Sequence, residues 1–377
     1  MKRIAVTAAA LFIAACGGID EPVALEAADA VAPSERAPGA PELAQSADKF
    51  DRERVAELDR RVNAGDFPDV NGIVVLKRGE LLLERYYDVD VNDTHNPRSV
   101  GKTFASAMLG IALDDGHIES LDQTLADFYT LEDYENPSDA KASVTIGQLL
   151  TMTSGFDGND DNMDSPGNEE WMYPQDDWVR WTLNLPMASD RAPGERWAYF
   201  TAGVVVLGDI LHQSLPGGLE DYADETLFAP LGIRDYRWQH TPQGVANTAG
   251  GIQLTPRGFA VFGQLYKNGG TYDGQRILSE SWVRESLTPR VDVRTDGVDR
   301  YGYLWWHKHY EVDGERHAVA YASGNGGNKI FVFEDLPLVI AVTASAYGQR
   351  YMHRQVDEIV RDYLLPAILG GEPSDET

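Results

Sequence analysis

The sequence predicts an α/β (α+β) protein in which one antiparallel sheet, built from both ends of the chain and flanked by helices, carries an inserted, mostly helical domain. Runs of β-prone apolar residues occur at 72–87 and again between 301 and 345, whereas helical patterns prevail from 119 to 240. Because sequential strands usually become neighbours, one sheet closed from both chain ends is the simplest arrangement. A cleft between the sheet and the helical insertion would be the usual place for a functional site.

The first residues are expected to form a processing signal. The chain begins Met-Lys-Arg and continues with an apolar run ending at Ala15, which is shorter than the roughly 20 residues of a membrane span. The run ends with an aliphatic residue and two small residues directly before Cys16, the only cysteine. This pattern resembles the lipobox of bacterial lipoproteins. The resemblance implies a signal peptide over 1–15, a lipid on Cys16, and a lipid-anchored protein of the bacterial cell envelope. An ordinary secretory signal peptide is the alternative.

Residues 16–48 are predicted to be a disordered tether between the lipid and the folded body. The stretch 17–48 contains nine Ala, four Pro, no aromatic residue, and seven acidic residues against a single base. Such a segment cannot bury enough apolar surface to offset the entropy lost on ordering it.

Composition excludes several classes of function. Acidic residues outnumber Lys and Arg by 60 to 32, and no cluster of basic residues is present that could displace counterions from phosphates, so we expect no nucleic-acid partner. A single cysteine excludes a disulfide framework and a Cys-rich zinc site within one chain. Neither a P-loop nor a dinucleotide-binding pattern occurs, and no cofactor is expected.

The folded body is expected to begin with a helix near 49–64 and a hairpin over 72–87 that turns at 77–80. A helix over 99–116 follows, because its apolar residues recur at helical spacing and Gly116 ends it. Strands at 301–310, 317–322, 328–334 and 338–345 and a helix at 354–365 complete the chain. The sheet domain is therefore predicted over 49–118 and 241–377, and the helical domain over 119–240.

Ser99 and Lys102 form the first candidate pair for chemistry. Two residues at this spacing lie on one face of the first turn of a helix. A serine hydroxyl becomes a nucleophile when a neighbouring base takes its proton, and a lysine can be that base when burial lowers its pKa. The helix N-terminus also presents N–H groups that can hold an oxyanion. A Ser-x-x-Lys pair is common by chance, and an N-cap serine beside a solvated lysine is the alternative.

Two further segments can contribute groups to the same candidate site. Tyr199 precedes an apolar helix, where it would relay a proton to a leaving group or pack its ring in the core. Residues 322–328 form a Gly-rich stretch between two predicted strands. That stretch would let a substrate approach the backbone closely, or would form a plain hairpin turn.

The order of these segments resembles the serine β-lactamase, D,D-peptidase and esterase superfamily, in particular the class C β-lactamase-like branch with its esterases and aminohexanoate-oligomer hydrolases. Supporting segments lie at 98–104, 110–118, 145–155, 227–233 and 301–306. The resemblance implies the β-lactamase/transpeptidase-like fold and a serine hydrolase in which Ser99 is acylated, Lys102 is the general base and Tyr199 shuttles a proton. It also implies an oxyanion hole from the N–H groups of Ser99 and Asn325, with substrate-binding residues Ser323, Gly324 and Thr201.

Two departures from the family pattern bear on the substrate. The family's Tyr-x-Asn motif is Tyr-x-Thr here, because Thr201 replaces the amide. The family's Lys-Thr-Gly triplet begins with Ala322, so the lysine that would pair with a carboxylate is missing. We therefore expect cleavage of ester or amide bonds in small substrates. Hydrolysis of β-lactams or cell-wall peptides, acyl transfer, and a catalytically silent binding protein are the alternatives.

The segment 157–177 carries eight acidic residues and no base. Its start is superficially similar to a calcium loop, but Asn162 stands where glycine is required and Asn168 where a bidentate glutamate is required. We expect a solvated acidic loop beside the cleft, and no metal site. Three aromatic residues of this part of the chain would either line the cleft or pack into the helical core: Trp171, Tyr173 and Trp178.

Overall fold

The computed structural model describes residues 39–295 and 298–370. The predicted signal peptide over 1–15, the lipidation site at Cys16 and the tether as far as residue 38 lie outside the described residues. Among the helices of the described stretches, none has both the length and the apolar character needed to cross a membrane.

The end of the predicted tether belongs to the folded body. Ser46 donates its backbone N–H to the carbonyl oxygen of Leu81, and Leu81 donates its own N–H to the carbonyl of Ala44. Asp48 forms ion pairs with two basic residues of the hairpin turn, Lys77 and Arg78. Leu81 lies in the strand at one edge of the sheet, whose free backbone groups this segment satisfies. Composition does not reveal such pairing, and the tether boundary at 48 therefore lies too late in the chain.

One antiparallel sheet of eight strands forms the centre of the described chain, in the order β2-β1-β12-β11-β10-β9-β8-β7. The N-terminal hairpin joins the C-terminal strands where β1 pairs with β12, from Val70 opposite Ala344 to Lys77 opposite Leu338. The predicted sheet closed from both chain ends is thereby confirmed. The strands are β1 (Val70–Lys77), β2 (Glu80–Tyr86), β7 (Val291–Thr295), β8 (Val298–Tyr301), β9 (Trp306–Val312), β10 (Glu315–Gly324), β11 (Asn328–Phe333) and β12 (Leu338–Ala344).

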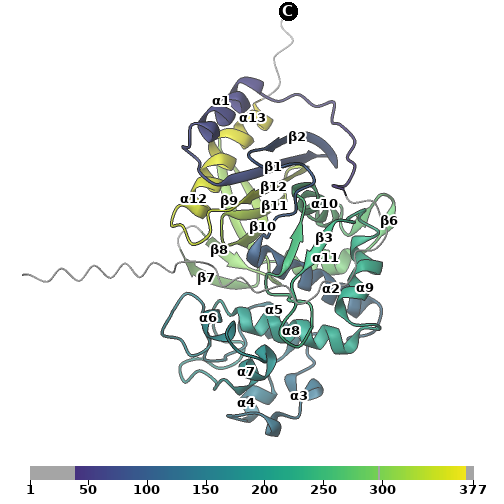
Figure 1. The fold of residues 1–377 in the computed structure, drawn as a ribbon, viewed down its shortest axis with the longest axis vertical. Helices are drawn as coiled ribbons and strands as arrows, with labels where there is room; N and C mark the ends of the chain where they lie inside the picture. Colours follow the sequence, from purple (N-terminus) through teal and green to yellow (C-terminus); the bar gives the residue numbers. More distant parts are fainter. Residues whose placement is uncertain (1–38, 296–297, 371–377) are drawn as a thin grey trace, which may run out of the picture. The chain divides into compact units, whose positions relative to one another are not determined.

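The sheet is buried on both faces because apolar side chains alternate sides along its strands. On β12, Ile340 and Val342 pack in the cluster formed with the terminal helices α1 (Arg52–Asn63), α12 (Met352–Glu358) and α13 (Leu365–Leu369), and with the π-helical segment η4 (Ile359–Leu364). Val339 and Ala341 belong to the other cluster, with α2 (Lys102–Asp114) and α10 (Pro256–Lys267). Figure 1 shows the terminal helices together beside the sheet.

The expected helical character between 119 and 240 is present. Its main helix is α8 (Thr201–Ser214), which is buried along most of its length and contacts α2, α5 and α7. The contact with α2 brings the segment before α8 close to the turn before α2. The described residues group into one compact unit, and the division at 118 and 241 stays a prediction. The other helices here are α3 (Leu125–Phe128), α4 (Asp139–Ala142), α5 (Ile146–Leu150), α6 (Glu169–Met172), α7 (Trp178–Asn184) and α9 (Leu219–Ala223).

Three regions were not anticipated from the sequence. The short strands β3 (Tyr236–Trp238) and β4 (Ile252–Leu254) form a separate hairpin, and a second small hairpin joins β5 (Thr271–Tyr272) and β6 (Gln275–Arg276). Strands β7 and β8 extend the main sheet beyond β9. Strands this short carry too few residues for an alternating pattern to be recognised. Helix α11 (Glu280–Ser286) lies between β6 and β7.

Candidate active site

Ser99 lies in a 3₁₀ turn, η1 (Arg98–Gly101), that leads directly into α2. The helix predicted from Ser99 therefore begins at Lys102 as an α-helix. Arg98 has a φ of 54°, a left-handed conformation that non-glycine residues rarely adopt. Gly250 packs against this turn so closely that a Cβ there would lie 3.0 Å from the Arg98 carbonyl carbon. The turn that carries Ser99 is thus held in a strained conformation by its surroundings, as is common at functional sites.

The side chain of Lys102 is hydrogen-bonded to Ser99, the predicted nucleophile. Its Nζ donates to Ser99 Oγ at 2.8 Å and to the Ala249 carbonyl oxygen at 2.7 Å. The side chain is 1% exposed, and it forms no salt bridge with the described residues. Burial lowers the pKa of Lys102 below its ordinary value, although the charges of Glu169 and Asp160 act in the opposite direction. A lower pKa makes the neutral amine more accessible, and that amine can accept the serine proton.

Tyr199 lies beside this pair. Lys102 Nζ is 5.1 Å from the centroid of the Tyr199 ring, and the tyrosine hydroxyl interacts with Ser99. Burial raises the pKa of Tyr199 well above its ordinary value, and Tyr301 acts in the same direction, whereas the interaction with Ser99 opposes the shift. The phenol therefore keeps its proton and can donate it. The structure brings all three predicted catalytic side chains together.

Gly324 ends β10 directly against the Ser99 turn. A Cβ at this position would lie 1.9 Å from the carbonyl oxygen of Pro97 and 3.1 Å from the backbone nitrogen of Ser99, so only glycine fits. The next residue, Asn325, uses its side-chain oxygen to accept the Gly348 N–H at 2.8 Å. No hydrogen bond among the described residues uses the backbone N–H of Ser99 or of Asn325. An oxyanion hole formed by these two N–H groups stays a prediction.

The two remaining predicted binding residues are placed differently. Ser323 is partly exposed, and its hydroxyl accepts a hydrogen bond from Lys329 Nζ at 2.8 Å. The Thr201 side chain is 1% exposed, and its hydroxyl has no hydrogen-bond partner among the described residues. A substrate contact by Thr201 or by Ser323 stays a prediction.

Asp160 connects the acidic loop to the tyrosine segment. One carboxylate oxygen accepts the Thr201 N–H at 2.6 Å, and the other accepts the Glu169 N–H at 2.9 Å. Its own N–H donates to the Tyr199 carbonyl at 2.8 Å. Burial, followed by the charge of Glu169, raises the pKa of Asp160 to about 7. The expectation of a fully solvated loop is therefore wrong at this residue, because one carboxylate replaces water for two buried N–H groups.

The three aromatic residues in and just after the acidic segment differ in burial. Trp178 is buried in the core, whereas Trp171 and Tyr173 are 49% and 38% exposed. The ring of Tyr199 is instead stacked on Trp306, with 5.7 Å between the ring centroids. Sequence reasoning did not place Trp306 in the site, because no spacing relates β9 to a loop about a hundred residues earlier.

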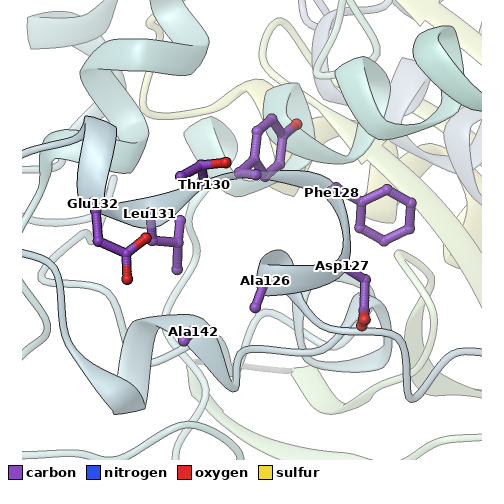
Figure 2. A pocket seen from close by; sticks show the side chains of 8 residues that line it. Ala126, Asp127, Phe128, Thr130, Leu131, Glu132 and Ala142 are labelled. Carbon is purple, nitrogen blue, oxygen red and sulfur yellow. The ribbon is translucent and has the colours of Figure 1, made fainter.

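A surface hollow of about 420 Å³ lies in the helical part of the chain, lined by residues 126–132 and Ala142 (Figure 2). None of the predicted site residues lines it. Its Asp127 carboxylate is already engaged, because it accepts hydrogen bonds from the N–H and the hydroxyl of Thr124. In the described parts of the chain, no group of His, Cys, Asp and Glu side chains is arranged to hold a metal ion.

Comparison with known proteins identifies relatives that match most of the folded part of the chain. A family model described as β-lactamase matches residues 56–361. The 6-aminohexanoate-dimer hydrolase of Paenarthrobacter ureafaciens is 24% identical over 275 residues, which is 67% of either chain. A Bacillus anthracis structure described as a candidate 6-aminohexanoate-dimer hydrolase superposes with a TM-score of 0.68 at 17% identity, over 89% of both chains. EstCE1, described as a hydrolase with promiscuous acyltransferase activity, gives a TM-score of 0.63 at 13% identity, over 81% of this chain and 97% of that one.

Proposed function

Because the chain belongs to the β-lactamase family, we propose that it is a serine hydrolase that forms an acyl-enzyme on Ser99 and cleaves ester or amide bonds of small substrates. The observation that supports this most strongly is the 2.8 Å hydrogen bond between Lys102 Nζ and Ser99 Oγ. The other hydrogen-bond partner of Lys102 is a carbonyl oxygen, so no salt bridge holds the amine in its charged form.

The reaction follows from the groups around Ser99. The neutral amine of Lys102 takes the hydroxyl proton while Ser99 Oγ attacks the carbonyl carbon of the substrate. The N–H groups of Ser99 and Asn325 stabilise the oxyanion that develops. Tyr199 donates its proton to the departing alcohol or amine and is reprotonated by the Lys102 ammonium. Water then cleaves the ester on Ser99 and restores the free enzyme.

Two other reactions share the same acyl-enzyme. An alcohol in place of water would give acyl transfer, and the likeness to EstCE1 is the observation that favours testing it. Cleavage of β-lactams is the other, favoured by the family match. Product analysis in the presence of methanol separates transfer from hydrolysis, because only transfer yields a methyl ester.

Turnover of p-nitrophenyl butyrate and nitrocefin tests the proposal. We expect the wild type to release p-nitrophenol, and Ser99→Ala to lose about 10³-fold or more of kcat/KM, since the nucleophile is gone. Ser281→Ala, at an exposed serine of α11, is the matched control and should keep full activity. Equal turnover by Ser99→Ala would contradict the proposal. Rapid Ser99-dependent cleavage of nitrocefin would make β-lactams the first substrate class.

We also propose, from the sequence alone, that Cys16 carries a lipid that anchors the protein to the cell envelope. Cys16→Ser should move the protein from the membrane fraction to the soluble fraction after expression in a Gram-negative host, since a single thiol is the only attachment point. Fractionation followed by immunoblotting measures this. Retention of Cys16→Ser in the membrane fraction would contradict a lipid at this residue.

A further inference from the structure

Asp160 holds the backbone that follows Tyr199 at two points. Its own N–H donates to the Tyr199 carbonyl oxygen at 2.8 Å, and its carboxylate accepts the Thr201 N–H at 2.6 Å. These two bonds restrict the backbone dihedral angles directly after the tyrosine. A catalytic side chain is placed precisely only where its backbone is fixed, so the bonds help to set where the Tyr199 hydroxyl lies relative to Ser99.

Met152 holds the backbone on the other side of the tyrosine. Its carbonyl oxygen accepts the Ala198 N–H at 3.0 Å, and its sulfur lies 3.3 Å from the Phe200 nitrogen. A thioether sulfur is a weak acceptor, whereas a hydrogen bond to a carboxylate is about twice as strong as one between neutral groups. The stronger anchor for the residues after Tyr199 is therefore the side chain of Asp160.

The same carboxylate caps helix α8. This helix begins at Thr201, and its N-cap residue is Phe200, which forms no side-chain capping bond. The first N–H groups of a helix have no partner within the helix, and a negative charge is favoured beside them. Asp160 provides both the acceptor and the charge from a distant segment, so its loss would free the start of α8, two residues after Tyr199.

Asp160 is itself fixed in place. Its second carboxylate oxygen accepts the Glu169 N–H at 2.9 Å, and its carbonyl oxygen accepts from the side chain of Asn168 at 3.0 Å. Asn168 is 1% exposed, so this support comes from inside the protein. Both oxygens of the carboxylate are thus engaged, and its orientation is determined before any substrate arrives.

The charge of Asp160 also reaches the base. Among the described residues, the carboxylates that act on Lys102 are those of Glu169 in α6 and of Asp160, and both oppose the lowering of its pKa by burial. The Tyr199 ring, 5.1 Å from Lys102 Nζ, adds no charge because the phenol keeps its proton. Burial, followed by the charge of Glu169, raises the pKa of Asp160 to about 7, so its own charge is present above that pH.

We propose that Asp160 is a positioning residue of the hydrolase, which fixes Tyr199 beside Ser99 through the backbone and stabilises the Lys102 ammonium that forms when the serine loses its proton. It touches neither the substrate nor the reacting atoms, and it acts through Tyr199 and Lys102. This inference rests on the proposed hydrolase function. It separates Asp160 from the other acidic residues of its segment, which the sequence pattern treats alike.

Asp160→Asn tests this role with p-nitrophenyl butyrate. An amide has a single acceptor oxygen, so one of the two N–H groups that the carboxylate accepts would face an NH₂ group instead. We expect kcat to fall about 10- to 100-fold while KM changes by less than about threefold, because a displaced catalytic group slows the chemical step. The pH at which kcat/KM reaches half its plateau should decrease, because an anion near Lys102 is removed.

Three further variants separate position from charge. Asp164→Asn is the matched control, since it removes one charge from the same segment at an exposed residue, and it should match the wild type. Glu169→Gln removes a charge but keeps the N–H that Asp160 accepts, so it should lower the half-plateau pH and lose less kcat than Asp160→Asn. Asp160→Glu keeps the charge but displaces the carboxylate by one methylene group. It should restore part of kcat and the wild-type pH profile.

Wild-type kcat in Asp160→Asn would overturn the positioning role, and a lower kcat with an unmoved pH profile would show that Asp160 only supports the fold. If thermal denaturation shows that Asp160→Asn is unfolded, Asp160→Glu decides, because full wild-type kcat in that variant would contradict the need for this carboxylate position. Ser99→Ala is assayed in parallel. Ser99-dependent turnover that Asp160→Asn leaves unchanged overturns only this inference, whereas turnover that does not require Ser99 overturns the hydrolase proposal.

Discussion

Lys102→Arg is expected to lower kcat/KM for p-nitrophenyl butyrate by about 10²–10⁴-fold, the usual contribution of a positioned acid or base. A guanidinium stays protonated at any working pH, so arginine cannot take the proton of Ser99. The fold should survive, because arginine can still donate to the Ala249 carbonyl, which is one of the two partners of Lys102. Steady-state kinetics on samples with matched melting temperatures measures this.

Lys141→Arg is the matched control for this variant. Lys141 is also buried and likewise has two hydrogen-bond acceptors, the carbonyl oxygens of Glu135 and Leu183, but it does not contact Ser99. We expect its activity to stay near that of the wild type per folded molecule. Near wild-type turnover by Lys102→Arg would remove Lys102 from the mechanism.

The pH dependence of kcat/KM for the wild type provides a second test of Lys102 as the general base. Because the base must be neutral to accept a proton, kcat/KM should rise with pH until it passes the pKa of Lys102 and then level off. Burial lowers this pKa below the ordinary lysine value of 10.5, so the plateau should begin below that pH. A profile that still rises at pH values where a solvated lysine titrates would show that Lys102 is not the base.

Gly324→Ala is expected to lower kcat by about 10²–10³-fold, the loss that follows removal of one oxyanion donor. The new Cβ would lie 1.9 Å from the Pro97 carbonyl oxygen, so the end of β10 would have to withdraw from the Ser99 turn. That withdrawal carries the Asn325 N–H away from the reacting carbonyl, and the effect should fall more on kcat than on KM.

The matched control for this variant is Gly147→Ala in α5, where a Cβ would meet its nearest neighbour at 3.5 Å, an ordinary contact. This variant should retain activity. Full activity of Gly324→Ala would mean that the close packing of β10 on the Ser99 turn has no part in catalysis.

The parts of the site that depend on local spacing could be predicted from the sequence. Ser99 and Lys102 are three residues apart, and their hydrogen bond follows from one helical turn. Runs of β-prone apolar residues likewise predicted the central strands, because β-branched and aromatic residues favour strands. Tyr199 and Asn325 were placed through the family resemblance, since nothing in their own neighbourhoods links them to Ser99.

The groups that sequence reasoning missed all reach the site from distant segments. The Ala249 carbonyl, which holds Lys102, comes from a loop between β3 and β4, and any residue would present the same carbonyl. Asp160 stood among eight acidic residues, with nothing to distinguish the buried one. Such contacts depend on tertiary structure rather than on local pattern.

Intact-mass analysis after treatment with a fluorophosphonate probe tests the central claim most directly, because it reports a covalent bond to one side chain and requires no knowledge of the natural substrate. The wild type should gain the mass of a single phosphonyl group, peptide mapping should place that group on Ser99, and Ser99→Ala should gain nothing. An adduct of equal yield in Ser99→Ala, or one mapped to another residue, would contradict the assignment of Ser99 as the nucleophile.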